Sequence, residues 1–246
     1  MRRKEHAADE VTGICAADLP SLPFALSHTQ RLLVASFHEP QQMLSWSLTR
    51  PGFQMARRVA WIEIRDADLP AGQDAEQIIT IRIAKAKLAD AISLITSRDV
   101  SRHHTSQVTI DDVVATCVTT VGLSNGERVG QRFATTRTGV GTINTMVHVS
   151  KPLSEAALIE AITIAAEART AAILDAGVRR SGVAITGTGT DCIVVAAPRG
   201  GSVRFAGMHT AVGEALGASI YKAMRDGIAT WLQDMEAMEL AAGVEG

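Results

Sequence analysis

The segment "TGTGTD", residues 186–191, gathers many small polar groups directly before the apolar run "CIVVAAP". Its glycine amides could hold an anion or an amide oxygen, a threonine hydroxyl could act as a nucleophile, and its aspartate could orient a histidine or a water. It lacks the lysine of a GxxxxGK[ST] loop and the third glycine of a GxGxxG fingerprint, so the sequence does not support standard nucleotide-loop chemistry. A tight turn accounts for the same letters. The candidate site residues are Gly187, Thr188, Gly189, Thr190 and Asp191.

A second polar group occurs in "FAGMHTAVGE", residues 205–214, where His209 stands at the entrance of a predicted helix and Glu214 falls in its first turns. Free amides at a helix N-terminus favour anions, and a histidine titrates near neutral pH. This pattern suits anion binding or acid/base catalysis. A histidine packed at a helix cap, with the glutamate in solvent, is the alternative.

The charged segment "SRDVSRHH", residues 97–104, is typical of a solvated loop. Arg98 and Arg102 could instead bind an anionic arm of a substrate. His103 and His104 are adjacent, so on an extended chain they point to opposite faces, and no second ligand pair accompanies them. We therefore predict no metal site.

The three cysteines, Cys15, Cys117 and Cys192, are isolated and lack CxxC spacing, which argues against a disulfide framework and a cysteine-rich zinc site. A reducing cytoplasm fits them best. Cys192 begins an apolar run, where packing is a more common role than catalysis.

The composition excludes several partners. The chain has 246 residues, 46% hydrophobic and 20% charged, with a net charge of -2, so no broad basic field would attract nucleic acid. The start "MRRKEHAADEVTG" lacks the apolar stretch of a signal peptide, and no run of roughly 18 apolar residues predicts a membrane span. A homo-oligomer is compatible with this composition.

The patterns predict one mixed domain. Asp74 followed by Gln77 resembles a helix cap, and Ser154 can cap a second helix that Gly177 terminates. A third helix should carry an apolar stripe, and Gly213 in its first turns should allow a close backbone approach. Residues 124–126 should form a turn after a strand. Predicted strands cover 31–37, 42–49, 57–66 and 92–96, the runs "DDVVATCVTTV" and "GTINTMVHVS", and two apolar strands on either side of residues 186–191; predicted helices cover 74–87, a segment beginning after Ser154, and 210–238.

We expect an α/β fold, with a mixed α+β arrangement as the alternative, in which helices pack on a single sheet and a long helix closes the chain. The expected domain spans 29–240, after a flexible leader at 1–28 and before a tail at 241–246. Asn125 and Asn144 border strands in polar turns, where they could hydrogen-bond an amide or stabilise the turns.

Six segments together resemble the adenosylcobinamide amidohydrolase (CbiZ) family: "TSRDVSRHH", "TVGLSN", "GTIN", "PLSEAALIEAITIAAEARTAAILDAG", "TGTGTDCIVVAAP" and "FAGMHTAVGEALG". The resemblance covers about residues 30–225 with order and spacing kept. Arg169 stands where many relatives carry lysine. The site residues that it implies are Asn125, Thr142, Asn144, Glu167, Thr170, Thr188, Thr190, Asp191, His209 and Glu214.

The resemblance implies a cytoplasmic salvage enzyme that hydrolyses the amide between the corrin propionate and the aminopropanol arm, releasing adenosylcobyric acid. It also implies that complete cobamides such as pseudocobalamin are substrates of some relatives. The corrinoid brings its own cobalt, and we expect no other cofactor. In one hypothesis Asp191 or Glu214 activates water or orients His209, with the amides of 187–189 near the oxyanion; in another, a threonine attacks. A non-catalytic corrinoid- or phosphate-binding module is the alternative.

Overall fold

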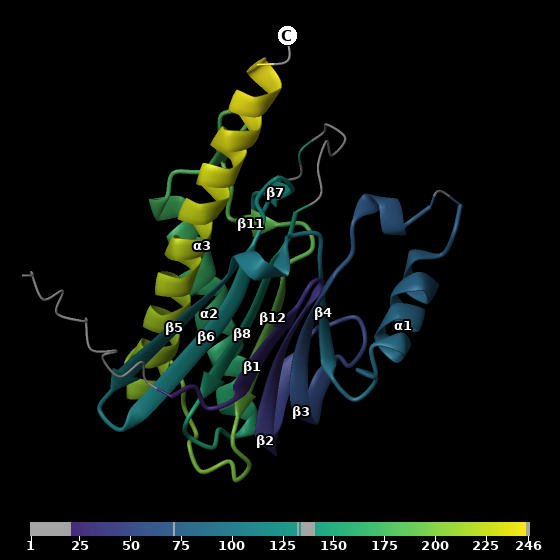
Figure 1. The fold of residues 1–246 in the computed structure, drawn as a ribbon. Helices are drawn as coiled ribbons and strands as arrows, with labels where there is room; N and C mark the ends of the chain where they lie inside the picture. The colour runs from purple at the N-terminus through teal and green to yellow at the C-terminus, as the bar shows by residue number, and fades with distance from the viewer. Residues whose placement is uncertain (1–20, 71, 132, 134–140, 245–246) are drawn as a thin grey trace, which may run out of the picture.

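The computed structural model describes residues 21–70, 72–131, 133 and 141–244, which form a mixed sheet with helices packed on it (Figure 1). The strand order is β4-β3-β2-β12-β8-β6-β5, and β1 pairs with β2. This confirms the α/β class. The strands are β1 (Ala25–Thr29), β2 (Leu32–Ser45), β3 (Gly52–Glu63), β4 (Ile92–Thr96), β5 (His103–Ile110), β6 (Val113–Val121), β7 (Gly126–Glu127), β8 (Ile143–Val149), β9 (Arg179–Arg180), β10 (Val183–Ala184), β11 (Gly187–Thr188) and β12 (Cys192–Ala197); the helices are α1 (Ala75–Lys85), α2 (Glu155–Asp175) and α3 (Ala211–Val244), with 3-10 turns η1 (Asp66–Asp68) and η2 (Val100–Arg102).

The sheet curls so that its inner face packs against itself. Side chains alternate along β3: Val59 and Trp61 enter the same inner cluster as Val194 of β12, whereas Ile62 packs in the outer cluster with residues of α1. The Trp61 indole Nε1 donates to the backbone oxygen of Asn144 in β8 at 3.1 Å, although β3 and β8 are not neighbours in the sheet. The curl therefore brings β4 and the start of β8 together.

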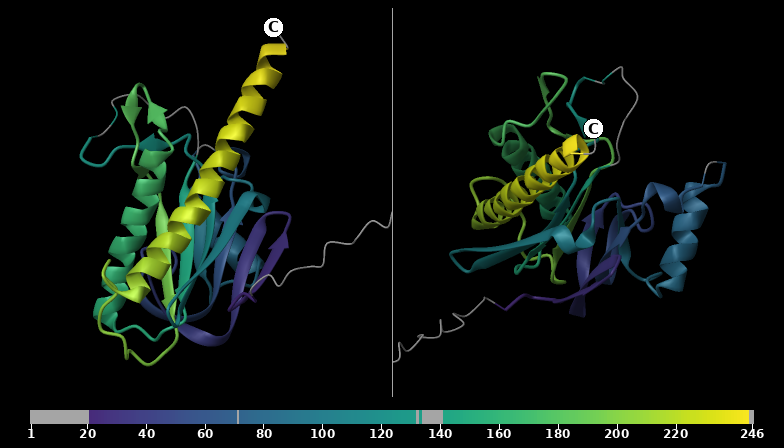
Figure 2. Two further views of the ribbon diagram at one scale, coloured as in Figure 1. Left: turned by 90° about the vertical axis from the view of Figure 1, so that its left-hand side faces the viewer. Right: turned by 45° about the horizontal axis from the view of Figure 1, so that its top comes forward.

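Helices α2 and α3 lie side by side over the outer face of β5, β6, β8 and β12 (Figure 2). The predicted stripe of α3 is confirmed, because Leu216, Ile220 and Met224 are all buried in one core cluster. A Cβ on Gly213 would lie 2.1 Å from the Gly207 carbonyl oxygen, so only glycine permits this approach. Thr210 begins the helix by accepting from the Gly213 amide at 3.0 Å.

The other helix caps are also confirmed. The Asp74 side chain accepts from the Glu76 and Gln77 amides, and the Ser154 hydroxyl accepts from the Ala157 amide. Short polar side chains at these positions satisfy amides that the first helical turn leaves without partners. Local sequence therefore determines where α1 and α2 begin.

Three predictions of element boundaries are wrong. Residues 31–37 and 42–49 belong largely to one strand, β2, because a register shift between Ser36 and Gln41 absorbs the turn expected at Glu39-Pro40. The apolar residues before the 186–191 segment pair only with Arg179–Arg180, as a two-residue ladder outside the main sheet. Helix α3 continues to Val244 instead of ending near 238.

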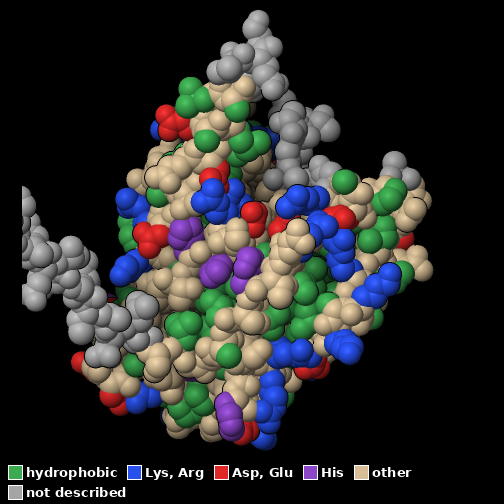
Figure 3. Space-filling view, in the orientation of Figure 1, with side chains coloured by type: hydrophobic (Ala, Val, Ile, Leu, Met, Phe, Trp, Pro, Cys, Tyr) green, Lys and Arg blue, Asp and Glu red, His purple; other side chains and the backbone are tan. Residues whose placement is uncertain are grey.

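The predicted leader falls mostly outside the described residues, which begin at 21; its last residues, 25–28, belong to β1 and pair with β2. Figure 3 shows apolar side chains on the face between the strands and α1, with basic side chains around them. In the described part of the chain, no helix combines the length and apolar character needed to cross a membrane.

Candidate functional site

A cavity of about 820 Å³ opens where β8 and β12 begin, beside β4 and α1. Its size is within the usual range for small-molecule sites. Six of the predicted residues line it: Asn125, Thr142, Asn144, Gly189, Thr190 and Asp191. The rest of its wall is Trp46, Ser47, Leu48, Ile64, Leu69, Ile79, Ser93, Leu94, Ile95, Thr96, Ser97, Gly141 and Cys192.

The 186–191 segment is held in place by side chains from three other elements. The Trp46 indole donates to the Asp191 backbone oxygen at 2.8 Å, and the Thr142 hydroxyl donates to the Thr190 oxygen at 2.8 Å. The Thr170 hydroxyl, on α2, donates to the Thr186 oxygen at 3.1 Å. Because so many carbonyls have partners, this turn forms a fixed wall.

The Asp191 carboxylate is the central charged group of this wall, and its side chain is only 6% exposed. One oxygen accepts the Thr188 hydroxyl hydrogen and the Ile143 amide (3.1 Å); the other accepts the Thr188 amide (2.9 Å) and pairs with Arg169 at 3.0 Å. A carboxylate has about four acceptor positions. Three of them are taken by hydrogen bonds here, and the Arg169 guanidinium lies beside the second oxygen as an ion pair.

Burial raises the pKa of Asp191, while the Arg169 guanidinium and the hydrogen bonds from Thr188 and Ile143 oppose that rise. Gly187 supplies the room: a Cβ at this position would lie 2.7 Å from the Asp191 Oδ2 atom. The glycine is thus required for the position of the ion pair.

A second cavity, of about 680 Å³, lies on the other side of the same turn. Gly189 and Asp191 line both cavities, so the turn separates them. Six predicted residues border this second space: Glu167 and Thr170 from α2, and Gly187, Thr188, Gly189 and Asp191 from the turn. The other lining residues are Glu127, Arg128, Val129, Ala166, Arg169, Ala171, Leu174 and Thr186.

Three buried polar atoms in the larger cavity lack hydrogen-bond partners among the described residues: Ser47 Oγ, Ser93 Oγ and Asn125 Oδ1. Buried polar groups are normally paired, so these atoms are available to a ligand. Sequence reasoning missed Trp46, Ser47 and Ser93. Their residue types form no distinctive pattern in the sequence. Pairing of β2 with β12 brings Trp46 and Ser47 beside Asp191, and the curl of the sheet brings Ser93 of β4 to the same cavity.

The structure separates His209 and Glu214 from Asp191, which corrects the predicted acid/base pairing. Strand β12 runs from Cys192 to Ala197 between them, a span of about 20 Å. The loop before α3 is bonded to Glu160 of α2, whereas Asp191 pairs with Arg169, about 13 Å further along the same helix. In Figure 1 the start of α3 lies at the opposite end of the sheet from β11.

The amides expected to hold the oxyanion are largely engaged. The Thr188 amide donates to Asp191 Oδ2, and the Gly189 amide donates to the Asn125 backbone oxygen at a long 3.4 Å. An oxyanion at the 187–189 amides would therefore have to displace existing bonds.

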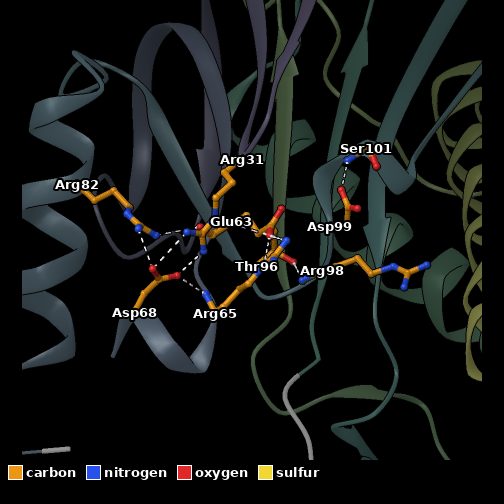
Figure 4. Close-up of polar contacts among 9 residues, drawn as sticks. All are labelled: Arg31, Glu63, Arg65, Asp68, Arg82, Thr96, Arg98, Asp99 and Ser101. Carbon is orange, nitrogen blue, oxygen red and sulfur yellow. Dashed lines mark hydrogen bonds and ion pairs between the residues drawn. The ribbon is translucent and has the colours of Figure 1, made fainter. Parts of the chain in front are cut away.

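Arg98 and Arg102 also have a different role from the one predicted. Both pair with Asp234 of α3, Arg102 at 3.0 Å. Figure 4 shows the Arg98 side chain pointing away from Thr96 and toward α3. These arginines attach the segment after β4 to the helix and do not line either cavity.

A charged network holds α1, which forms the outer wall of the larger cavity (Figure 4). Asp68 accepts from Arg31 and from Arg82 of α1, and the arginine hydrogen bonds lower its pKa. Glu63, 1% exposed, pairs with Arg65 at 2.6 Å. The network connects β2, β3 and α1 beside the cavity.

Cys192 lines the larger cavity, but burial raises the pKa of its thiol to about 11. A thiol with this pKa is a poor nucleophile at neutral pH. Within the described ranges, no group of three or more His, Cys, Asp or Glu residues is placed to hold a metal ion.

Residues 22–236 match the sequence family described as adenosylcobinamide amidohydrolase, CbiZ. No curated protein sequence matches the chain. The crystal structure of the PH0078 protein from Pyrococcus horikoshii OT3 is 8% identical, covering 85% of this chain and 80% of its own, with a TM-score of 0.41. A Burkholderia sp. beta-aminopeptidase is 10% identical, covering 83% and 82%, with a TM-score of 0.42.

Proposed function

The chain belongs to the adenosylcobinamide amidohydrolase family and is an amide hydrolase, and from this premise we propose that it converts adenosylcobinamide to adenosylcobyric acid. The bond cleaved is the amide between the corrin propionate and the aminopropanol arm. The observation that carries the proposal is the family match over residues 22–236, most of the chain.

The two cavities lie on opposite sides of the turn that carries Asp191, and a substrate that passes over this turn could place one bulky group in each of them. We place the ring edge in the larger cavity, where Trp46 and Leu48 are 46% and 51% exposed and offer apolar surface. The amine half extends into the smaller cavity beside Glu167 and Thr170. Complete cobamides such as pseudocobalamin would place a longer arm there.

Asp191 and Thr188 are the proposed chemical pair. Three hydrogen bonds and the Arg169 ion pair surround the buried carboxylate, so a water would have to compete with these partners for it. The Thr188 hydroxyl, however, already donates to Asp191 Oδ1, which is the arrangement of a nucleophile and its general base. The structure thus favours the threonine over a directly activated water.

In this mechanism the Thr188 oxygen attacks the amide carbon while its proton passes to Asp191. Asp191 then returns the proton to the departing aminopropanol nitrogen as the carbon–nitrogen bond breaks, leaving a threonyl ester. Water hydrolyses that ester and releases the corrin carboxylate and a free Thr188 hydroxyl.

Product analysis tests the activity. Purified protein is incubated with adenosylcobinamide, with its phosphate and with complete adenosylcobamides, and adenosylcobyric acid is measured by chromatography. Release of the product from at least one substrate supports the proposal. Corrinoid binding without any product, across pH and with added divalent metals, would establish a non-catalytic binding module instead.

A matched pair of variants tests the nucleophile. Thr188→Ser keeps the hydroxyl and should retain turnover within about tenfold, whereas Thr188→Val keeps the shape and should lower kcat by more than about 1000-fold. Hydroxylamine should trap the acyl group in the wild type. Full activity of the valine variant would exclude the threonine mechanism and return the role to water.

The proposed partner is a small corrinoid that carries its own cobalt. We place the reaction in the cytoplasm, in line with the unpaired thiols of Cys117 and Cys192. The proposed domain remains a single unit from about residue 25, where β1 begins, to the end of α3.

A further inference from the structure

The edge strand β4 presents unpaired backbone groups to the larger cavity. Strand β4 is last in the sheet order and pairs only with β3. Alternate residues of a strand direct their amide and carbonyl to the same side. The Thr96 carbonyl accepts from the Ile64 amide, so the backbone N–H and C=O groups of Thr96 and Leu94 point toward β3. Those of Ser93 and Ile95 therefore point away from β3, to the open edge.

Two side chains occupy part of this outward edge. The Ser93 amide donates to Thr49 Oγ1 at 3.2 Å, and the Ile95 carbonyl accepts from the Asn144 side-chain amide at 2.7 Å. The Ser93 carbonyl and the Ile95 amide lie between these two bonds. Among the described residues neither has a partner on that side, and both residues line the cavity.

A carboxamide fits this pair of groups, because its oxygen accepts from the Ile95 N–H while its NH2 group donates to the Ser93 oxygen. A second group supports the site: Ser93 is 1% exposed, and its hydroxyl has no partner in the described structure. Buried polar groups in a binding cavity favour a ligand that pairs with them.

We infer that the edge of β4 at Ser93 and Ile95 binds a peripheral carboxamide of the corrin ring, distinct from the amide that is cleaved. This inference rests on the proposed function, because it takes the ligand to be a corrinoid. Asn144 and Thr49 are positioning residues, since each holds the strand edge without occupying the open pair. The same edge discriminates against ring esters, which cannot donate to the Ser93 oxygen.

Amide hydrogen exchange, followed by NMR, tests the inference directly. The probe is dicyanocobyric acid, which keeps the ring carboxamides but has no arm to be cleaved. Binding should slow exchange of the Ile95 amide at least tenfold, while the Leu94 amide, already bonded to β3, serves as the internal control. Unchanged exchange of Ile95 at saturating probe would overturn the inference.

A pair of variants gives a second test. Ile95→Pro removes the outward N–H, which an edge strand tolerates, and also shortens the apolar side chain; Ile95→Val keeps the N–H while shortening the side chain. The proline variant should bind dicyanocobyric acid about tenfold more weakly than the valine variant. Equal affinities in two folded variants would refute the inference even if the enzyme hydrolyses adenosylcobinamide. If dicyanocobyric acid slows exchange of the Ile95 amide but the protein hydrolyses no corrinoid, only the proposed function is refuted.

Discussion

Replacing Arg169 by methionine should shift the pH dependence of turnover. Arg169 lies 3.0 Å from Asp191, and its positive charge opposes the rise in pKa that burial causes. Without the guanidinium, only the hydrogen bonds from Thr188 and Ile143 oppose the rise in the Asp191 pKa that burial causes. A neighbouring positive charge favours the ionised carboxylate, so removal of the guanidinium should raise the Asp191 pKa further.

The expected result follows from the role of Asp191 as a base. The carboxylate must be ionised to take the proton, so kcat/KM falls about tenfold for each pH unit below its pKa. In Arg169→Met the acidic limb should therefore move to higher pH, and the loss of kcat/KM should be greatest at pH values below the wild-type limb, by about tenfold for each pH unit that the limb moves. Arg169→Lys, which keeps the charge, should move the limb much less.

The assay is the pH profile of kcat/KM with adenosylcobinamide for the wild type and both variants, with thermal unfolding as the control for folding. An unchanged acidic limb in a folded Arg169→Met protein would refute the assignment of Asp191 as the base. A shift of the limb to lower pH would contradict the electrostatic argument itself.

Three further outcomes are expected. Gly187→Ala places a Cβ 2.7 Å from Asp191 Oδ2, so kcat should fall by about 100-fold or more while binding of dicyanocobyric acid persists; unaltered kcat would show that the ion pair can move freely. Cys192→Ala should keep kcat within about threefold, because a thiol with a pKa of about 11 does not ionise at neutral pH; a large loss would restore a role for the thiol. Burial lowers the pKa of His148 to about 4, so the unfolded chain takes up a proton at this residue before the folded protein does. The free energy of unfolding should therefore be full above about pH 6.5 and fall by on the order of 3 kcal/mol as pH decreases from about 6.5 toward 4. His148→Phe should remove this part of the pH dependence, measured by denaturant unfolding at about pH 7 and about pH 4.5.

Local signals in the sequence predicted the elements well. Asp74 and Ser154 act through their own neighbouring amides, so their caps could be read from a few letters. The α3 stripe is likewise a property of one helix. The turn predicted at Glu39-Pro40 is absent for a non-local reason. Pairing with β3 and β12 keeps β2 continuous through residues that, by themselves, favour a turn.

The candidate site was only partly predictable, because its partners lie far apart along the chain. The letters of 186–191 suggested a chemical role, but its counter-charge, Arg169, comes from the middle of α2. His209 lies close to Asp191 in sequence, yet β12 carries the chain to the other end of the sheet between them. The open edge at Ser93 and Ile95 is a property of the backbone, to which side-chain letters give no guide.

The position of β12 has a consequence for synthesis of the chain. Among the described strands it is the last in sequence, yet it lies in the middle of the sheet, antiparallel to β2 and parallel to β8. While the chain grows on the ribosome, the edges of β2 and β8 that pair with β12 therefore stay unpaired until residues 192–197 emerge. Such edges can pair with other chains, so the nascent protein is most exposed to aggregation before its central strand inserts.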